Sequence, residues 1–430
     1  MFGCVAGTNT FSQRVLTVEE AVAAALKNNY DIQLLRNDSA VYALNYGYRN
    51  AGFLPRLNAT TSVLYNNNNT TQRLADGTER KQSGIRSSNL QSSVNLNWTV
   101  FDGLKMFATR DKLAEFVALG NLTIRNQLVT SISDVIKTYY NIVRQKQQLL
   151  AISEQMAINE ERVKQADKKL TVGLGAKPEL LQAKLDLNAQ KAAQLKQLTL
   201  IEQLKEQLNQ LLVFEQGSSY EVTDSIPINQ DLLVTDIFTT AQSTNPELQV
   251  AKQNINIANI TLRERRAERF PVVSLNSAYN FSKTDNKLVV NNFTPLFNQN
   301  HGFNYGLTVS IPILNNFTVR RQIKEAQLDI DYQQILYNYK QATINTAISN
   351  AYKTYELQKR TLALEEENIK LARENVFIAL ERNRLGLSTI LELRETQKSL
   401  ADAYDRLIAA RYDTKVSETD LLRLRGDIIK

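Results

Sequence analysis

Residues 169–187 read KLTVGLGAKPELLQAKLDL, and residues 381–400 read ERNRLGLSTILELRETQKSL. Each stretch lies inside a long helical pattern and interrupts it at one glycine, Gly173 in the first and Gly386 in the second. When the two glycines are aligned, the leucines seven residues beyond each of them also align. Glycine readily adopts the left-handed conformation that ends a helix. The chain is therefore predicted to turn back on itself twice, at equivalent places.

Other motifs indicate that the whole chain is an internal duplication. FLPRLN and RFPVVSLN place Pro55 against Pro271, and KTYYNIV and NAYKTYE place Tyr139 against Tyr352. Each unit reads helix, strand, strand, long helix, turn, helix. The predicted domains are residues 1–15 as an N-terminal segment with the remains of a signal, 16–213 as the first repeat, 214–232 as a linker and 233–430 as the second repeat.

The helical patterns are unusually long. The first helix is predicted to begin at a capping box, Thr17 with Glu20, and to run to about Tyr48. The longest patterns span about 104–170 and 317–385 and contain no proline. At 1.5 Å per residue each would measure roughly 100 Å. Helices of that length cannot fold into a compact globule, so we expect them to pack side by side as a coiled coil or helical tunnel.

Four segments alternate between apolar and polar residues, at about 55–66, 89–101, 271–282 and 302–313. This period of two predicts strands with one apolar face and one wet face. Each is long enough to cross a membrane at a tilt, and long polar segments join the members of each pair. The residues predicted to face lipid are Leu57, Val63, Tyr65, Val94, Leu96, Trp98, Leu275, Tyr279, Tyr305, Leu307 and Val309.

Four strands pose a closure problem. An open sheet edge leaves unpaired backbone groups in hydrocarbon, and the smallest membrane barrels have about eight strands. The barrel would therefore be formed jointly by two, three or four copies of the chain, with about eight, twelve or sixteen strands. The alternative is an ordinary antiparallel sheet packed on a soluble core, which the strand pattern alone does not exclude.

The residue inventory argues against several kinds of chemistry. The chain has one histidine, His301, expected in a polar loop, and one cysteine, Cys4. No His/Cys metal cluster and no familiar nucleophile–histidine pair can be assembled, so no metal, cofactor or catalytic site is expected. The net charge of +7 is spread along the chain, which argues against nucleic-acid binding.

The first residues, MFGCVAGTNTFSQ, are typical of the end of a secretory signal. Cys4 after Gly3 is alternatively a lipid-attachment residue. Either interpretation indicates export from the cytoplasm.

The duplicated unit, FLPRL, WTVFDG and the two glycine turns together resemble the TolC-type outer-membrane efflux proteins. The resemblance covers about 16–426. It implies an α+β membrane protein, a homotrimer with a shared twelve-stranded barrel in the outer membrane of a Gram-negative bacterium and a periplasmic tunnel of long antiparallel helical hairpins. It also implies a periplasmic adaptor protein, an inner-membrane transporter of the RND, ABC or MFS type, and no cofactor.

The same resemblance assigns a role to the two turns. Val172, Gly173 and Leu174, and likewise Leu385, Gly386 and Leu387, match the tips on which the adaptor docks. Pro178 is expected in the first turn of the next helix, and Thr389 with Glu392 is expected to form a second capping box. The alternative is that both stretches are ordinary helix-hairpin turns around a buried leucine.

Glutamates recur every seven residues near the tips: Glu367, Glu374 and Glu381 in the second repeat, with Glu154 and Glu161 at the aligned places in the first. A period of seven puts each set on one helix face. One hypothesis is an acidic ring at the tunnel entrance, because carboxylate rings favour cations. The alternative is a solvated outer face with ion pairs to residues such as Lys370.

The resemblance predicts a passive exit duct through the outer membrane, part of a tripartite efflux or type I secretion system and fed by the adaptor and the transporter. The alternative function is a soluble periplasmic coiled-coil scaffold.

Overall fold

The computed structural model describes residues 15–218, 220–228, 232–289, 293–385 and 387–428. The chain divides into two compact units. The helical unit contains residues 1–39, 120–252 and 336–430, and the sheet unit contains residues 40–119 and 253–335. Each unit therefore takes segments from both sequence repeats. Cys4 and Gly386 lie outside the described residues.

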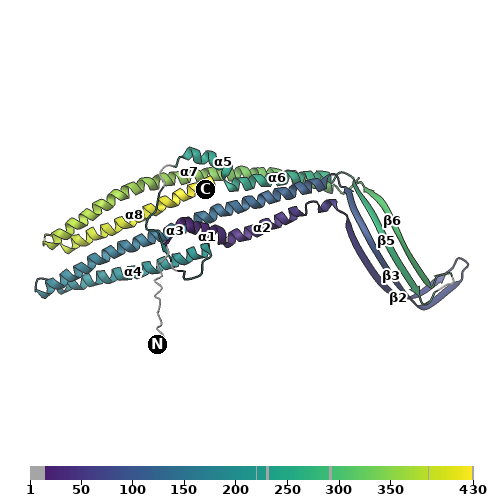
Figure 1. Cartoon of the computed structure of the whole chain (residues 1–430), viewed down its shortest axis with the longest axis horizontal. Helices are drawn as coiled ribbons and strands as arrows, with labels where there is room; N and C mark the ends of the chain where they lie inside the picture. Colours follow the sequence, from purple (N-terminus) through teal and green to yellow (C-terminus); the bar gives the residue numbers. More distant parts are fainter. Residues whose placement is uncertain (1–14, 219, 229–231, 290–292, 386, 429–430) are drawn as a thin grey trace, which may run out of the picture. The chain divides into compact units, whose positions relative to one another are not determined.

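The duplication is visible in the helices (Figure 1). The long helices α3 and α7 have 67 residues each, and α4 and α8 have 36 each. The predicted long helices are confirmed to within one residue at each end. The bounds are α1 Val18–Asn28, α2 Tyr30–Gly47, α3 Lys105–Thr171, α4 Lys177–Leu212, α5 Val234–Thr244, α6 Pro246–Ala267, α7 Thr318–Arg384 and α8 Ile390–Arg425, with a 3-10 turn at Ala51–Phe53.

The capping box of Thr17 and Glu20 is confirmed at the start of α1. The prediction of one continuous helix up to about Tyr48 is wrong, because Asn29 separates α1 from α2. The Asn29 side-chain oxygen accepts hydrogen bonds from the amides of Asp31 and Ile32, at 3.0 and 3.3 Å, and so begins a new helix.

The side-chain nitrogen of Asn29 donates to the carbonyl of Leu211 at the end of α4, at 3.2 Å. The second repeat has the same joint at Asn245, between α5 and α6. Its oxygen accepts from the next helix, and its nitrogen donates to the carbonyl of Leu424 at 2.8 Å. One asparagine per repeat therefore ends a helix, starts the next and ties both to a distant helix end.

Four strands form one antiparallel sheet in the order β2-β3-β5-β6. Their bounds are β2 Arg56–Arg73, β3 Glu79–Phe101, β5 Val272–Asn286 and β6 Phe297–Ser310. In the helical unit a short parallel pair joins β1 Val15–Leu16 to β4 Glu221–Val222. Among the described residues, no helix is both long and apolar enough to cross a membrane.

The strands of the first pair extend well beyond their predicted ends. The polar stretch at 66–89, expected as a loop, is mostly strand, and only a tight turn at 74–78 interrupts it, with Gly77 at φ +84°. Backbone pairing continues where both faces are polar, so alternation disappears although the strand does not. The expectation of a loop around His301 is wrong for the same reason, since this residue lies in β6.

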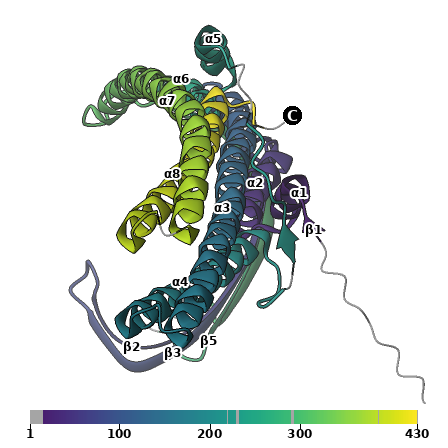
Figure 2. The same cartoon turned by 90° about the vertical axis from the view of Figure 1, so that its left-hand side faces the viewer.

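In the helical unit, neighbouring helices run side by side (Figure 2). They pack through lines of buried apolar side chains, here called seams. On α7, Leu362, Ile369 and Val376 recur every seven residues and pack against α8 residues such as Leu400 and Leu407. On α3, a second cluster around Tyr139 packs against α4 and α1. The heptad spacing is that of a coiled coil, as the sequence predicts.

Candidate functional site

The first hairpin tip joins α3 to α4. The amide of Leu174 donates to the carbonyl of Lys169 at 2.8 Å, and the amide of Gly173 donates to Leu170 at 3.1 Å. Gly173 has φ +78°, so the pattern is a glycine-terminated helix end. The side chains of Val172 and Leu174 are 66% and 83% exposed. The tip is thus a well-bonded turn that presents apolar side chains to solvent.

The described residues of the second tip, between α7 and α8, make the corresponding hydrogen bond. The amide of Leu387 donates to the carbonyl of Arg382 at 2.8 Å, which corresponds to the bond made by Leu174. Leu385 and Leu387 are 70% and 66% exposed. The leucines seven residues beyond the glycine positions, Leu180 and Leu393, are buried instead. The tip leucines themselves are therefore not the buried leucines of an ordinary hairpin turn.

The predicted starts of α4 and α8, the helices that follow the two tips, are confirmed in part. Pro178 lies in the first turn of α4. The amide of Glu392 donates to the hydroxyl of Thr389 at 3.2 Å, which caps α8. The predicted capping box is only half formed in the described structure, because the exposed Glu392 carboxylate does not return a hydrogen bond to Thr389. The sequence also gave no reason to single out Gly175, yet a Cβ there would lie 2.9 Å from the Leu170 nitrogen.

A polar cluster links the two hairpins above the tips. Arg162 of α3, almost buried, contacts Asp186 of α4 at 3.3 Å and Gln397 of α8 at 3.4 Å. Arg394 of α8 reaches the other carboxylate oxygen of Asp186 at 3.4 Å. Because these residues have no periodic pattern, the sequence did not reveal this cluster.

A second link lies further from the tips. The Tyr404 hydroxyl donates to Glu154 at 2.5 Å and accepts from Arg373 at 2.6 and 3.0 Å. Burial raises the pKa of Tyr404, and the hydrogen bond to Glu154 raises it further. The hydroxyl therefore stays protonated at neutral pH. The three residues connect α3, α8 and α7, so both hairpins are joined through one phenol.

The five glutamates of the predicted ring are all exposed, but they do not have equal surroundings. Glu154 is engaged by Tyr404, and Glu161 forms an ion pair with Lys164 at 3.8 Å. On α7, Glu367, Glu374 and Glu381 precede the seam positions 369, 376 and 383 by two residues, which places them opposite the packed face. In the described structure none of these three pairs with Lys370.

The strand register places the predicted lipid-facing residues on one face of the sheet. Leu57 pairs with Leu96, Val94 with Tyr279, and Trp98 with Leu275. The chain of pairs continues from Leu275 to Leu307, from Tyr279 to Phe303 and from Val273 to Val309. Directly paired residues share a face, so eleven predictions made from four separate segments meet on one surface.

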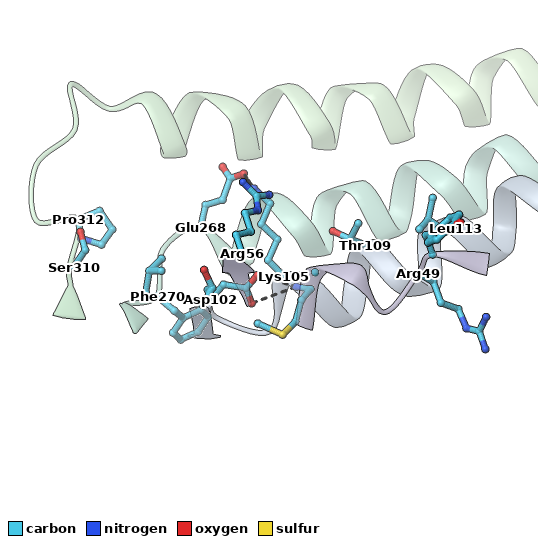
Figure 3. Close-up of a pocket in the computed structure, with 15 residues that line it drawn as sticks. Arg49, Arg56, Asp102, Lys105, Thr109, Leu113, Glu268, Phe270, Ser310 and Pro312 are labelled. Carbon is cyan, nitrogen blue, oxygen red and sulfur yellow. Dashed lines mark hydrogen bonds and ion pairs between the residues drawn. The ribbon is translucent and has the colours of Figure 1, made fainter. Parts of the chain in front are cut away.

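The opposite face is polar, and side-chain hydrogen bonds connect its neighbouring strands. Thr60 and Ser93 are 2.8 Å apart, and Asn276 donates to Thr308 at 3.0 Å. At the end of the sheet next to the helices, this face borders a cavity of about 680 Å³ (Figure 3). Arg56 of β2 and Ser310 of β6 both line it. Since these are the two edge strands, the sheet curls towards its polar face.

Charged side chains line the cavity beside Phe270 and Met106. Lys105 forms an ion pair with Glu268 at 2.7 Å, and the carboxylate of Asp102 accepts the amide of Met106 at 3.0 Å (Figure 3). The chain reaches α3 through two residues with positive φ, Gly103 at +74° and Leu104 at +69°.

Comparison with known proteins identifies this architecture. The sequence model of the outer membrane efflux protein family matches residues 21–212 and 238–427. The chain belongs to this family. Outer membrane efflux protein BepC from Brucella suis biovar 1 (strain 1330) is 21% identical over 440 residues, which cover 98% of this chain and 88% of that protein.

Solved structures share the fold at low identity. A membrane protein from Pseudomonas aeruginosa has a TM-score of 0.78 at 17% identity, with 96% of this chain and 91% of that chain covered. The Campylobacter jejuni CmeC outer membrane channel has a TM-score of 0.77 at 17% identity, with 96% and 86% covered. The predicted fold of helical hairpins and membrane strands is confirmed.

The protein is thus an outer-membrane exit duct for tripartite efflux, with a helical part in the periplasm. It works with an adaptor and an inner-membrane transporter, as members of its family do. The family is one of channels, not of enzymes. Membership decides against the soluble scaffold as an alternative.

Proposed function

We propose that three copies of the chain close the barrel and tunnel, that the adaptor docks on the two tips, and that cargo then passes passively from a transporter of the RND, ABC or MFS type to the cell exterior. The observation that carries this proposal is that both tips expose apolar side chains, Val172 and Leu174 at the first and Leu385 and Leu387 at the second. Apolar side chains grouped on an exposed surface often mark a site of protein contact.

Closure by several copies is supported first by the sheet. Within the chain, β2 and β6 each have one hydrogen-bonded neighbour, so each leaves a long edge open. Such edges are costly in hydrocarbon, and only closure removes them. Three four-stranded sectors give twelve strands, and the curl towards the polar face puts that face in the lumen and the apolar face against lipid.

Apolar stripes on the helices support the same conclusion. Exposed apolar residues recur at heptad spacing on two helices. They are Leu34, Val41 and Leu44 on α2, and Leu328, Tyr332, Ile335, Tyr339, Leu357, Leu364, Leu371 and Ile378 on α7. Stripes of this spacing bury themselves against another helix in coiled coils. A neighbouring copy would supply that helix.

The links between the hairpins suggest how the periplasmic end opens. Glu154, Tyr404 and Arg373 hold α3 to α7 and α8. Closer to the tips, Gln397 and Arg394 of α8 contact Arg162 of α3 and Asp186 of α4 and so join the same two hairpins. We propose that adaptor binding at the tips separates the hairpins and breaks these bonds. Energy for export comes from the transporter.

The glutamate stripe on α7 is proposed to line the entrance and to favour cations. Replacing Glu374 by glutamine should weaken block by multivalent cations and lower cation selectivity in single-channel recordings. Unchanged block and selectivity would remove Glu374 from the ring.

The docking proposal is tested with a tip double variant, Leu174→Glu with Leu387→Glu, in cells that depend on this chain for efflux. We expect accumulation of an efflux dye to rise to the level of cells without the protein, while trimers and bilayer conductance persist. Leu150→Glu is the control, since Leu150 is another exposed leucine, on α3 and away from the tips. Full efflux in the double variant would contradict docking at the tips.

A further inference from the structure

A second cavity lies at the end of the sheet remote from the helices. Its volume is about 280 Å³, and Tyr65, Arg86, Asp285 and Lys287 are among the residues that line it. It lies before the bulge at 68–70, where the β2–β3 pairing is still regular. The family assignment does not use this cavity.

The register shows on which face of the sheet the cavity opens. Tyr65 pairs with Ser88, and Ser88 pairs with Asp285. Tyr65 is eight residues beyond Leu57 on an uninterrupted strand, so both residues share the apolar face. The amide of Lys287 donates to the carbonyl of Arg86 at 2.9 Å, which continues the same edge. The cavity therefore lies just beyond the last tyrosine of the apolar face.

Two cations at this cavity, Arg86 and Lys287, have no side-chain partner among the residues that the structure describes. Across the described residues, no hydrogen bond or ion pair joins the side chain of Arg86 or Lys287 to another group. The only carboxylate in the lining, Asp285, already forms an ion pair with Lys283 at 3.3 Å. Lys283 in turn lies over the ring of Phe297 at 5.5 Å. The cavity is thus left with a net positive charge at the border of an apolar surface.

We propose that this cavity holds a phosphate of a phosphorylated glycolipid in the outer leaflet, a proposal that rests on the lipid-facing assignment of the apolar face. Arg86 binds two phosphate oxygens through its planar guanidinium, and Lys287 adds a point charge. The Tyr65 hydroxyl supplies a further donor at the headgroup level. The acyl chains then lie along Val63 and Phe281, which occupy the same face.

A lipid is favoured over free phosphate because the cavity borders the apolar face of the sheet. A free anion needs only the cations, whereas the cavity residue Tyr65 is followed on the same face by the exposed apolar side chain of Val63. A headgroup with attached chains satisfies both surfaces at once. The site would fix the depth and rotation of the barrel in the membrane.

The test uses the full-length channel in nanodiscs of phosphatidylcholine with a small fraction of lipid A. Native mass spectrometry then counts the lipid A molecules retained after transfer to detergent. Arg86→Gln with Lys287→Gln should lower retention roughly tenfold or more. Arg80→Gln with Lys81→Gln removes two cations from the same hairpin outside the cavity and should retain lipid A as the wild type does.

Equal loss in both double variants would overturn the site in favour of general charge attraction. Equal retention of lipid A stripped of its phosphates would overturn the phosphate contact, and displacement by inorganic phosphate alone would make the site one for free anions. Bilayer conductance separates this proposal from the channel itself. Channels that insert and conduct but retain no lipid A contradict only the lipid site, whereas failure of the wild type to insert contradicts the lipid-facing assignment.

Discussion

The two repeats build the same joints with different residues. Where β3 meets α3, Gly103 has φ +74°, and at the aligned place before α7, Asn316 has φ +53°. Both are followed by a residue with positive φ, Leu104 and Phe317. Asparagine tolerates the left-handed region, so it replaces glycine where space allows a side chain. The comparison separates positions that require a backbone conformation from positions that also require empty space.

Gly103 requires both the left-handed backbone conformation and the absence of a side chain. A Cβ at this position would lie 2.8 Å from the Cβ of Phe270 and closer still to the carbonyl oxygen of Ala267. We expect Gly103→Ala to destabilise the sheet unit by roughly 3 kcal/mol, from backbone strain together with overpacking. The measurement is the temperature at which purified assemblies dissociate in detergent.

Asn316→Gly is the matched variant in the second repeat. It keeps the left-handed conformation and adds no atoms, so the dissociation temperature should change by little. A loss as large as that of Gly103→Ala would show that the two joints are not equivalent.

At the two asparagine joints, in contrast, both repeats use the same residue, so the same substitution can be made in each. Asn29→Ala and Asn245→Ala each remove a helix cap and a bond to a distant carbonyl. Each should cost about 2 kcal/mol of unfolding free energy, measured by chemical denaturation followed by circular dichroism. Asn28→Ala, one residue away, is the control and should cost much less.

The two tips test whether the turns serve folding or docking. A Cβ at Gly173 would meet no atom within 4 Å, so a substitution there strains only the backbone, by about 1–2 kcal/mol. Replacing Gly173 and Gly386 by bulky residues should impair export while trimers and insertion persist. Loss of trimers would instead assign these glycines to folding.

The smallest effect on stability is expected at the link between the hairpins. Tyr404→Phe keeps the ring but removes the hydrogen bonds to Glu154 and Arg373. The substitution should lower the free energy of unfolding by about 1 kcal/mol. The open probability in single-channel recordings should nevertheless rise. Tyr412→Phe is the control, because within the described part of the chain the Tyr412 hydroxyl makes a single long hydrogen bond of 3.4 Å, to the carbonyl of Lys137. Equal open probabilities in both variants would contradict the link.

Much of this fold could be predicted from periodicity. The long helices, the shared face of the strands and the place of the tips follow from heptads, alternation and glycine. Periodicity failed where both strand faces are polar, as at 66–89, and where a single polar side chain breaks a helix, as at Asn29. It also could not find Gly175, because the constraint there is a close contact across the turn with Lys169 and Leu170. Nor could it find the contact of Arg394 with Asp186, because these residues are far apart in sequence.

The most direct test of the account is the protein mass of the unheated, detergent-solubilised channel. One chain has a mass of 48.7 kDa, and the account predicts three times this value. Three copies satisfy strand closure and give both apolar stripes a partner. A mass of one, two or four chains for the conducting species would contradict the trimeric duct.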